Sequence, residues 1–310
     1  MMEQLTDVKG VQKKEANIEQ IKLLEINLSR TNLKSLPKFN SNFQLCTTLN
    51  LSRNNLKCGI PWLASLKRLK WIDLSYNSLT ELSDVCGSIS TLLYLNISNN
   101  NLGKLPEWIL YLDKVTELNL SHNPISIAFQ AHYKIAKWNK VQVCNLENTN
   151  LGSVPDCVKF APDLRVLSVG NRWPTSSLFP TRNRLCLFPE PLPRSLHILE
   201  ISNLGIVNLE SNWKSLIHLK ELKASTNNIS WCSYDFTSLP ELEVCDLSWN
   251  ELTVVPQDFG LLKNLCHINL SYNKLVVLPQ SFEQLKNLKH LDLYSNFLES
   301  IQCNLANMSR

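Results

Sequence analysis

Apolar residues recur at one fixed interval along this chain, with an asparagine at a fixed place among them. The clearest copy is the segment 265–298, LCHINLSYNKLVVLPQSFEQLKNLKHLDLYSNFL. Two units of 23 residues match there at five positions, Leu265, Ile268, Leu270, Asn273 and Leu275 in the first and Leu288, Leu291, Leu293, Asn296 and Leu298 in the second. The pattern L-x-x-L-x-L-x-x-N-x-L predicts one short strand and one return segment per unit.

The spacing of the apolar positions indicates how such a unit would pack. Side chains alternate between the two faces of a strand, so positions four and six point to the same side, into the space under the return segment. The asparagine at position nine is tolerable in that interior because its amide can bond the backbone where the strand turns away. One unit cannot bury its own leucines, so neighbouring units must stack to form the core.

The same pattern covers most of the chain. Units begin at Leu23, Cys46, Leu69, Leu92, Val115, Val141, Leu164, Leu196, Leu219, Leu242, Leu265 and Leu288, and nine of the eleven steps are 23 residues. Return segments repeat as well, with Leu36-Pro37, Leu105-Pro106, Val154-Pro155, Val255-Pro256 and Leu278-Pro279 at one phase. Proline there ends an extended piece and favours an irregular or short helical return.

These motifs resemble the leucine-rich repeat superfamily, and LPQSFEQLKNLKHLDLYSNFL looks like the 23-residue class found in intracellular scaffolds of the Ras pathway and of cell polarity. The resemblance implies an α/β fold, a curved horseshoe solenoid of about 12 repeats with a parallel sheet on its concave face. It also implies a scaffold or adaptor that binds another protein on that face.

The chain divides into four expected regions. Residues 1–22 have a loosely helical apolar spacing and predict an N-terminal cap segment. Repeats one to seven cover 23–172, a Pro- and Arg-rich insertion covers 173–195, and repeats eight to twelve cover 196–310. No polar capping repeat closes the last region, so we expect either a short terminal lid or a fragment of a longer protein.

Two units are longer than the others. The fifth has three extra residues, and its segment 129–138 predicts a longer outer helix. The seventh has nine extra residues, and its asparagine position falls on Arg172, with Leu204 at that position in the next unit. We read the 173–195 insertion as either a docking loop or an irregular junction between repeats.

Charge and cysteine content narrow the class of protein. The net charge is +4 without a basic run, which argues against a nucleic-acid partner, and no apolar stretch reaches the roughly 18 residues of a membrane span. Three of the ten cysteines, Cys46, Cys144 and Cys245, replace core apolar residues, and none forms a C-x-x-C pair. Together with the lack of a signal peptide, this predicts a reducing cytoplasmic compartment.

The outward strand positions supply the candidate binding residues. Position five is a polar ladder, to which we give a structural role, whereas positions three and eight carry exposed aromatic rings near aspartates. The predicted partner site comprises Trp71, Asp73, Tyr76 and Tyr94 in one group and Asp246, Trp249, His267, Tyr272, His290, Asp292 and Tyr294 in another. Such rings are typical of interface hot spots, although they could also simply pack on one another.

Catalysis finds no support in the motifs. No glycine-rich phosphate loop, nucleophile elbow or H-E-x-x-H segment occurs, so we predict no enzyme activity, no cofactor and no small-molecule substrate. His267 and His290 stand on adjacent strands, but stacked neighbours produce such pairs without a ligand, and we predict no metal. The alternatives to a scaffold are a regulatory repeat region of a larger enzyme, such as a phosphatase or cyclase, and an innate-type ligand sensor.

Overall fold

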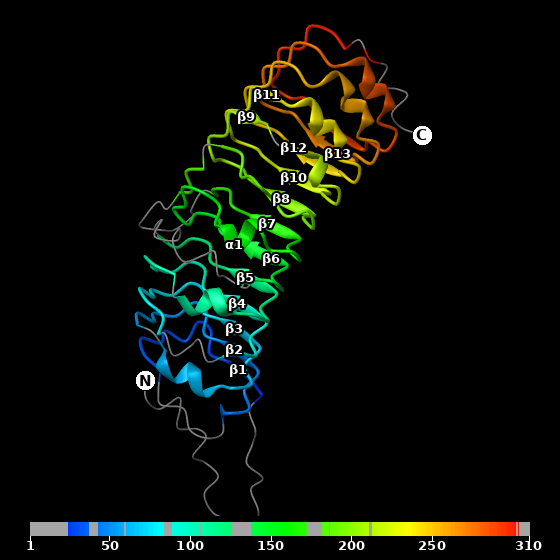
Figure 1. Ribbon diagram of the computed structural model, residues 1–310. Coiled ribbons are helices and arrows are strands. Elements are labelled where there is room, and N and C mark those ends of the chain that lie inside the picture. Colours follow the sequence, from blue (N-terminus) through cyan, green and yellow to red (C-terminus); the bar gives the residue numbers. More distant parts are fainter. Residues whose placement is uncertain are drawn as a thin grey trace, which may run out of the picture.

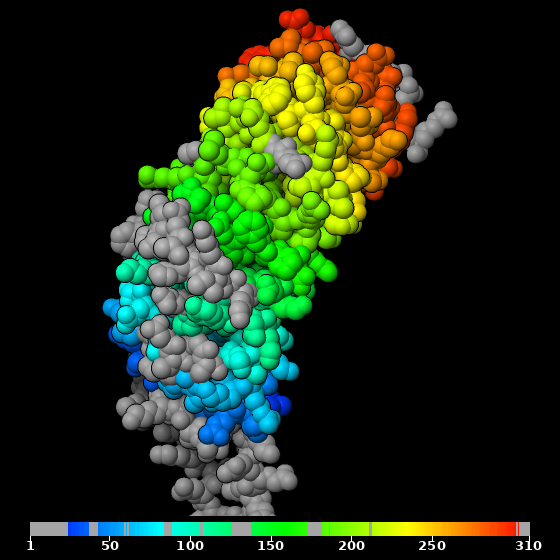
Figure 2. Space-filling model, in the orientation of Figure 1, coloured from blue at the N-terminus to red at the C-terminus, as the bar shows by residue number. Residues whose placement is uncertain are grey.

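A computed structural model describes residues 24–36, 43–58, 60–83, 89–105, 107–125, 138–172, 182–185, 187–210, 213–301 and 303. This part leaves out the N-terminal cap segment and residues 129–137 of the expected outer helix. It also leaves out residues 173–181 of the insertion and the last residues of the chain. Figure 1 shows the described units stacked one above another, with the first and last units at opposite ends of a long array. Side chains of successive units abut along its length (Figure 2).

One parallel sheet runs through the whole array. Its 12 strands pair in the order of the chain, apart from the two short strands that belong to a second sheet. They are β1 (Glu25–Asn27), β2 (Thr48–Asn50), β3 (Trp71–Asp73), β4 (Tyr94–Asn96), β5 (Glu117–Asn119), β6 (Val143–Asn145), β7 (Val166–Ser168), β8 (Ile198–Glu200), β10 (Glu221–Lys223), β12 (Val244–Asp246), β13 (His267–Asn269) and β14 (His290–Asp292). This is a leucine-rich repeat solenoid, as the sequence predicted.

Each strand consists of motif positions three to five, and like positions pair across the sheet. His267 pairs with His290, Ile268 with Leu291 and Asn269 with Asp292. All the other strand pairs of this sheet have the same register. The middle residue points into the core and the two flanking residues point outward, since alternate side chains of a strand face opposite ways. The register therefore turns the sequence repeat into straight columns of equivalent side chains.

In most units, an asparagine at position nine ties the unit to the one before it. Asn273 donates from Nδ2 to the carbonyl oxygens of Leu247 (2.9 Å) and Leu270 (3.1 Å), and its Oδ1 accepts from the N–H of Leu252 (3.0 Å). Equivalent bonds recur at Asn54, Asn77, Asn100, Asn123, Asn227, Asn250 and Asn296. These amides satisfy backbone groups that the interior hides from water.

Position eight adopts a left-handed backbone in nearly every unit. Positive φ values near 55° occur at Arg30, Arg53, Tyr76, Asn99, His122, Asn148, Asn203, Thr226, Trp249, Tyr272 and Ser295. Non-glycine residues rarely adopt this conformation, so the repeated turn must be imposed by the stacked neighbours. It places a full side chain at the carboxyl end of each strand.

The return segments form short helices behind the sheet. They are η4 (Pro61–Ser65), η6 (Glu107–Tyr111), α1 (Asp156–Lys159), η9 (Trp213–Ser215), η10 (Tyr234–Ser238), η11 (Gln257–Leu261) and η12 (Gln280–Gln284), and β9 (Asn208–Leu209) pairs with β11 (Trp231–Cys232). Proline precedes α1, η11 and η12, as predicted. Buried rings of Phe236, Phe259 and Phe282 stack from unit to unit and fill this layer.

The seventh unit corrects one assignment made from the sequence. Arg172 does not occupy the asparagine position, because Asn183 does: its Nδ2 donates to Leu146 O and Val169 O (both 2.7 Å), and its Oδ1 accepts from the N–H of Leu151 (2.8 Å). Asn183 is buried, and Leu185 follows it at position eleven. The added residues therefore precede Asn183, whereas Leu204 does lack the amide in the next unit. The division of the chain into four regions otherwise stays a prediction.

Candidate functional site

The outward side of the sheet presents three columns of side chains, from positions three, five and eight. We call this surface the sheet face. All eleven predicted site residues lie on it or at its edge. Seven lie within β3, β4, β12, β13 and β14, and Tyr76, Trp249, Tyr272 and Tyr294 follow those strands.

The N-terminal aromatic group consists of Trp71, Tyr76 and Tyr94. The half-buried rings of Trp71 and Tyr94 stack with their centroids 4.8 Å apart and an interplanar angle of 9°. Tyr76 is exposed, but the guanidinium of Arg53 lies 4.4 Å from its ring centroid. Contacts within the chain therefore cover much of the ring surface of this group.

The C-terminal aromatic group consists of Trp249, Tyr272 and Tyr294. Trp249 and Tyr272 stack at a centroid distance of 3.8 Å, and Tyr294 meets Tyr272 edge-on at 5.3 Å. Trp249 is nevertheless 55% exposed and Tyr294 67% exposed. At the other end of β13 and β14, the exposed imidazoles of His267 and His290 stack with their ring centroids 4.5 Å apart in the position-three column.

The aspartates at position five have a structural role, as predicted for this column. One carboxylate oxygen of Asp73, Asp246 and Asp292 accepts the backbone N–H two residues ahead, at 2.8 to 2.9 Å. Asparagine does the same at Asn27, Asn50, Asn96, Asn119, Asn145 and Asn269. An aspartate adds to this bond a negative charge on the sheet face.

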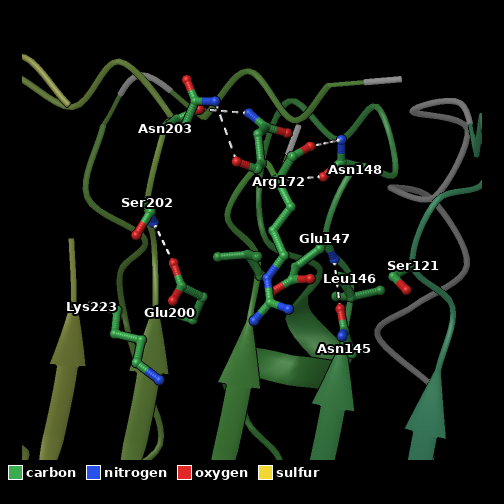
Figure 3. A network of polar contacts seen from close by, with 12 residues as sticks. Ser121, Asn145, Leu146, Glu147, Asn148, Arg172, Glu200, Ser202, Asn203 and Lys223 are labelled. Carbon is green, nitrogen blue, oxygen red and sulfur yellow. Dashed lines mark hydrogen bonds and ion pairs between the residues drawn. The ribbon is translucent and has the colours of Figure 1, made fainter. Parts of the chain in front are cut away.

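A charged network that sequence reasoning missed lies at the carboxyl ends of β6, β7, β8 and β10, midway along the array (Figure 3). Glu147 stands at position seven, where most units have serine, and its side chain is only 3% exposed. The Nε of Arg172 lies 3.2 Å from Glu147 Oε1, and the backbone N–H of Arg172 donates to Asn148 Oδ1 (2.7 Å). The departure from serine at Glu147 was the signal available in the sequence.

Glu200 and Lys223 extend this network across the next strands. Glu200 Oε1 accepts the N–H of Ser202 at 2.9 Å, and a side chain on Gly170 would clash with both residues. Lys223 lies beside Glu200 in Figure 3 and forms an ion pair with Glu221 at 2.6 Å. Opposite charges therefore alternate from strand to strand at this end of the sheet, and the chain itself supplies both signs.

Burial perturbs several titrating groups on the sheet face. Burial raises the pKa of the Glu147 carboxyl, although Arg172 opposes the shift. Burial also raises the pKa of the Tyr94 hydroxyl, with a contribution from the charge of Asp73. Burial and the nearby Arg172 charge lower the pKa of His122. Low-dielectric surroundings disfavour the charged form in each case.

The two aromatic groups lie far apart. Five strands separate β4 from β12 in the sheet order, so about 29 Å of sheet lies between them at the usual strand spacing. In the described part of the chain, no group of three or more His, Cys, Asp or Glu residues could hold a metal ion. No helix within those same residues has the length and apolarity needed to cross a bilayer.

Comparison with known proteins agrees with the repeat assignment. The family model of the leucine-rich repeat matches residues 67–125 and 240–298, the segments that contain the two aromatic groups. No curated protein sequence matches the chain.

Solved structures share the fold at low sequence identity. A leucine-rich repeat protein of Leptospira interrogans is 24% identical with a TM-score of 0.56, and the alignment covers 96% of this chain and 92% of that one. An internalin of Listeria monocytogenes is 18% identical with a TM-score of 0.66 and coverages of 93% and 85%. The Toll–Spatzle complex of Drosophila is 21% identical with a TM-score of 0.69, covering 91% of this chain and 38% of that one. Leucine-rich repeat proteins generally mediate binding between proteins.

Proposed function

We propose that this chain is an interaction scaffold that binds another protein on the sheet face. The observation that carries the proposal is the C-terminal aromatic group, whose rings remain exposed beside Asp246 and Asp292. Large rigid rings bury much area at low entropic cost, and such residues dominate binding energy at protein interfaces. We propose binding without catalysis, because leucine-rich repeat proteins generally mediate binding between proteins.

The N-terminal aromatic group is the weaker part of the proposed site. Trp71 and Tyr94 are half-buried in one stack, and Tyr76 lies under Arg53. Since less ring surface is free there, a partner gains less by covering it. We propose that the C-terminal group anchors the partner and that the N-terminal group contributes secondary contacts.

We further propose that the chain acts as an adaptor in intracellular signalling. The resemblance to the Ras-pathway and polarity scaffolds supports this role. The eight described cysteines are unpaired, and burial raises the pKa of Cys157 and Cys232 to about 12, so their thiols are poor nucleophiles. Such a set suits a reducing cytoplasm. Trapping thiols with a maleimide during cell lysis tests this, because disulfides among these eight cysteines would contradict the cytoplasmic assignment.

Replacing Trp249 tests the binding role. We expect Trp249→Ala to leave the free energy of unfolding within about 1 kcal/mol, because the ring is more than half exposed. It should lower the affinity for a purified partner by at least about tenfold, as the loss of a central hot-spot residue does. Affinity purification from cytosol with the wild-type chain supplies the partner, and titration calorimetry measures the loss.

Tyr234→Ala is the matched control. Tyr234 is also an exposed aromatic residue, but it lies in η10 of the return layer. Its replacement should not change partner affinity. Equal affinities for the wild-type chain and Trp249→Ala would remove the C-terminal aromatic group from the binding site.

A further inference from the structure

We propose that the C-terminal aromatic group receives an extended partner segment with two arginines three residues apart, one against the Trp249 ring and both near the position-five aspartates. This proposal rests on the proposed function and adds the chemistry of the partner. It follows from a comparison of equivalent positions in the two aromatic groups, and from the charges that surround each of them.

The chain already contains one example of this contact. Arg53 and Tyr76 are consecutive members of the position-eight column, and the Arg53 guanidinium lies 4.4 Å from the Tyr76 ring centroid. The residue before Trp249 in the same column is Thr226, which carries no charge. Trp249 is the ring type that binds a cation most strongly. The position filled by Arg53 in one group is therefore open to a partner's cation in the other.

Two aspartates, Asp246 and Asp292, stand next to this group and form no ion pair among the described residues. In each, one carboxylate oxygen accepts a backbone N–H, and in Asp246 the same oxygen also accepts the Ser248 hydroxyl. The neighbouring lysines are engaged elsewhere, Lys223 with Glu221 and Lys274 with Glu251. At the carboxyl ends of β6 and β7, by contrast, Arg172 forms an ion pair with Glu147. A cationic partner would complement the two free charges.

Arginine fits better than lysine for a geometric reason. A guanidinium is planar, so it can stack on an indole while its N–H groups bond a carboxylate. Asp246 and Asp292 lie two strands apart, about 9.6 Å at the usual spacing. A polyproline II segment repeats every three residues, about 9.3 Å. Two arginines three residues apart would match this distance.

Synthetic peptides test the proposal directly. The probes are fluorescent dodecapeptides of glycine, serine and proline with two arginines placed two, three, four or six residues apart, and the same peptides with uncharged citrulline. By fluorescence polarisation, we expect the spacing of three to bind best and citrulline to weaken binding at least about tenfold. Raising the salt concentration should weaken it as well, because the contact is between charges.

Two isosteric variants locate the contact. Asp246→Asn keeps the backbone hydrogen bond, since asparagine makes it in other units, and should abolish the preference for arginine over citrulline. Asp73→Asn, the matched change in the N-terminal group, should leave that preference intact. Equal binding of arginine and citrulline peptides, no binding of any arginine peptide, or an arginine preference that survives Asp246→Asn would overturn the proposal. The protein partner obtained by affinity purification separates this proposal from the scaffold function. If that partner binds through Trp249 while the peptide test fails, the scaffold function stands and only the cationic partner is rejected.

Discussion

Single residues carry the stability of this fold when they occupy the inward positions of the motif. The leucines of the inner units are fully buried, and each asparagine at position nine bonds four or five backbone groups of two units, as Asn273 and Asn54 show. The polar position is therefore as specific as the apolar ones, because an unpaired backbone group in the interior costs free energy. Asn183 shows this most clearly, since it fulfils the role from within the seventh unit's longer return.

Leu270→Ala should lower the free energy of unfolding by about 2 to 5 kcal/mol, because the buried side chain leaves a cavity among stacked neighbours. Leu293→Ala is the matched change one unit later, where the same motif position is only partly buried. Leu293→Ala should lower the free energy of unfolding by clearly less than Leu270→Ala does. Urea denaturation of both variants measures the difference, and equal losses would contradict the assigned core.

Glu147→Gln should change how stability depends on pH. The folded-state pKa of Glu147 is raised above the ordinary value of 4.5, so the folded chain holds this proton more tightly than the unfolded chain does. Its contribution to stability is present below pH 4.5 and is lost as the pH rises through the folded-state pKa. The unfolding free energy of the wild type, relative to Glu147→Gln, should therefore fall as the pH rises from 4 to 8.

Denaturation curves at several pH values measure this difference. Glu243→Gln serves as the control for the chemical change, because Glu243 is exposed and lies just before β12, four strands along the sheet from β6. It should leave the free energy of unfolding within about 1 kcal/mol of the wild type. A flat difference for Glu147→Gln would mean that burial does not perturb this carboxyl.

At the scale of elements, the strands and the return segments follow different rules. The strands have three residues each and one register, so the sequence repeat alone placed every predicted strand position correctly. Return segments vary from unit to unit, and their packing depends on the neighbouring return. The short helices η11 and η12 pack against each other, with the rings of Phe259 and Phe282 stacked at 5.4 Å.

Gly260→Ala should destabilise the chain by about 1 to 3 kcal/mol, because a methyl group there would overlap the backbone carbonyl of Ser281 in η12. Gly103→Ala is the control, since nothing lies within 4 Å of the added methyl group and its φ is not positive. It should change stability by less than about 1 kcal/mol. Thermal denaturation distinguishes the two, and equal effects would refute the close approach of η11 and η12.

At the scale of the whole molecule, the chain behaves as a one-dimensional stack. Every strand of the 12-stranded sheet pairs only with its neighbours, and the phenylalanine stack of the return layer also runs from unit to unit. Stability in such an array is a sum over units and the interfaces between them. A substitution that weakens one unit should therefore destabilise that unit and its neighbours more than the distant units.

Amide hydrogen exchange tests this locality. In Leu270→Ala, we expect exchange to accelerate most in β12, β13 and β14 and least in β2, β3 and β4, because opening spreads from unit to unit. Mass spectrometry of peptic fragments, compared with the wild-type chain, gives the profile. Uniform acceleration along the array would show that the chain unfolds as one cooperative body.

The geometry of the candidate site was predictable only in part. The columns of positions three, five and eight follow from periodicity, so the sequence could name all eleven candidate residues. It could not say which rings are free, because stacking of Trp71 on Tyr94 and of Arg53 on Tyr76 depends on side-chain conformations across units. It also missed the ion pair of Arg172 with Glu147, which joins residues of two different units.

The sequence by itself determined the architecture, because a fixed interval of apolar residues and asparagines permits only one register of stacked strands. The tertiary structure alone decided where that interval is interrupted without breaking the stack. Asn183 reaches the interior because it can satisfy the same carbonyl groups as its counterparts, whatever the length of chain before it. Hydrogen bonding in a closed interior selects the residue by geometry, and sequence spacing does not record that geometry.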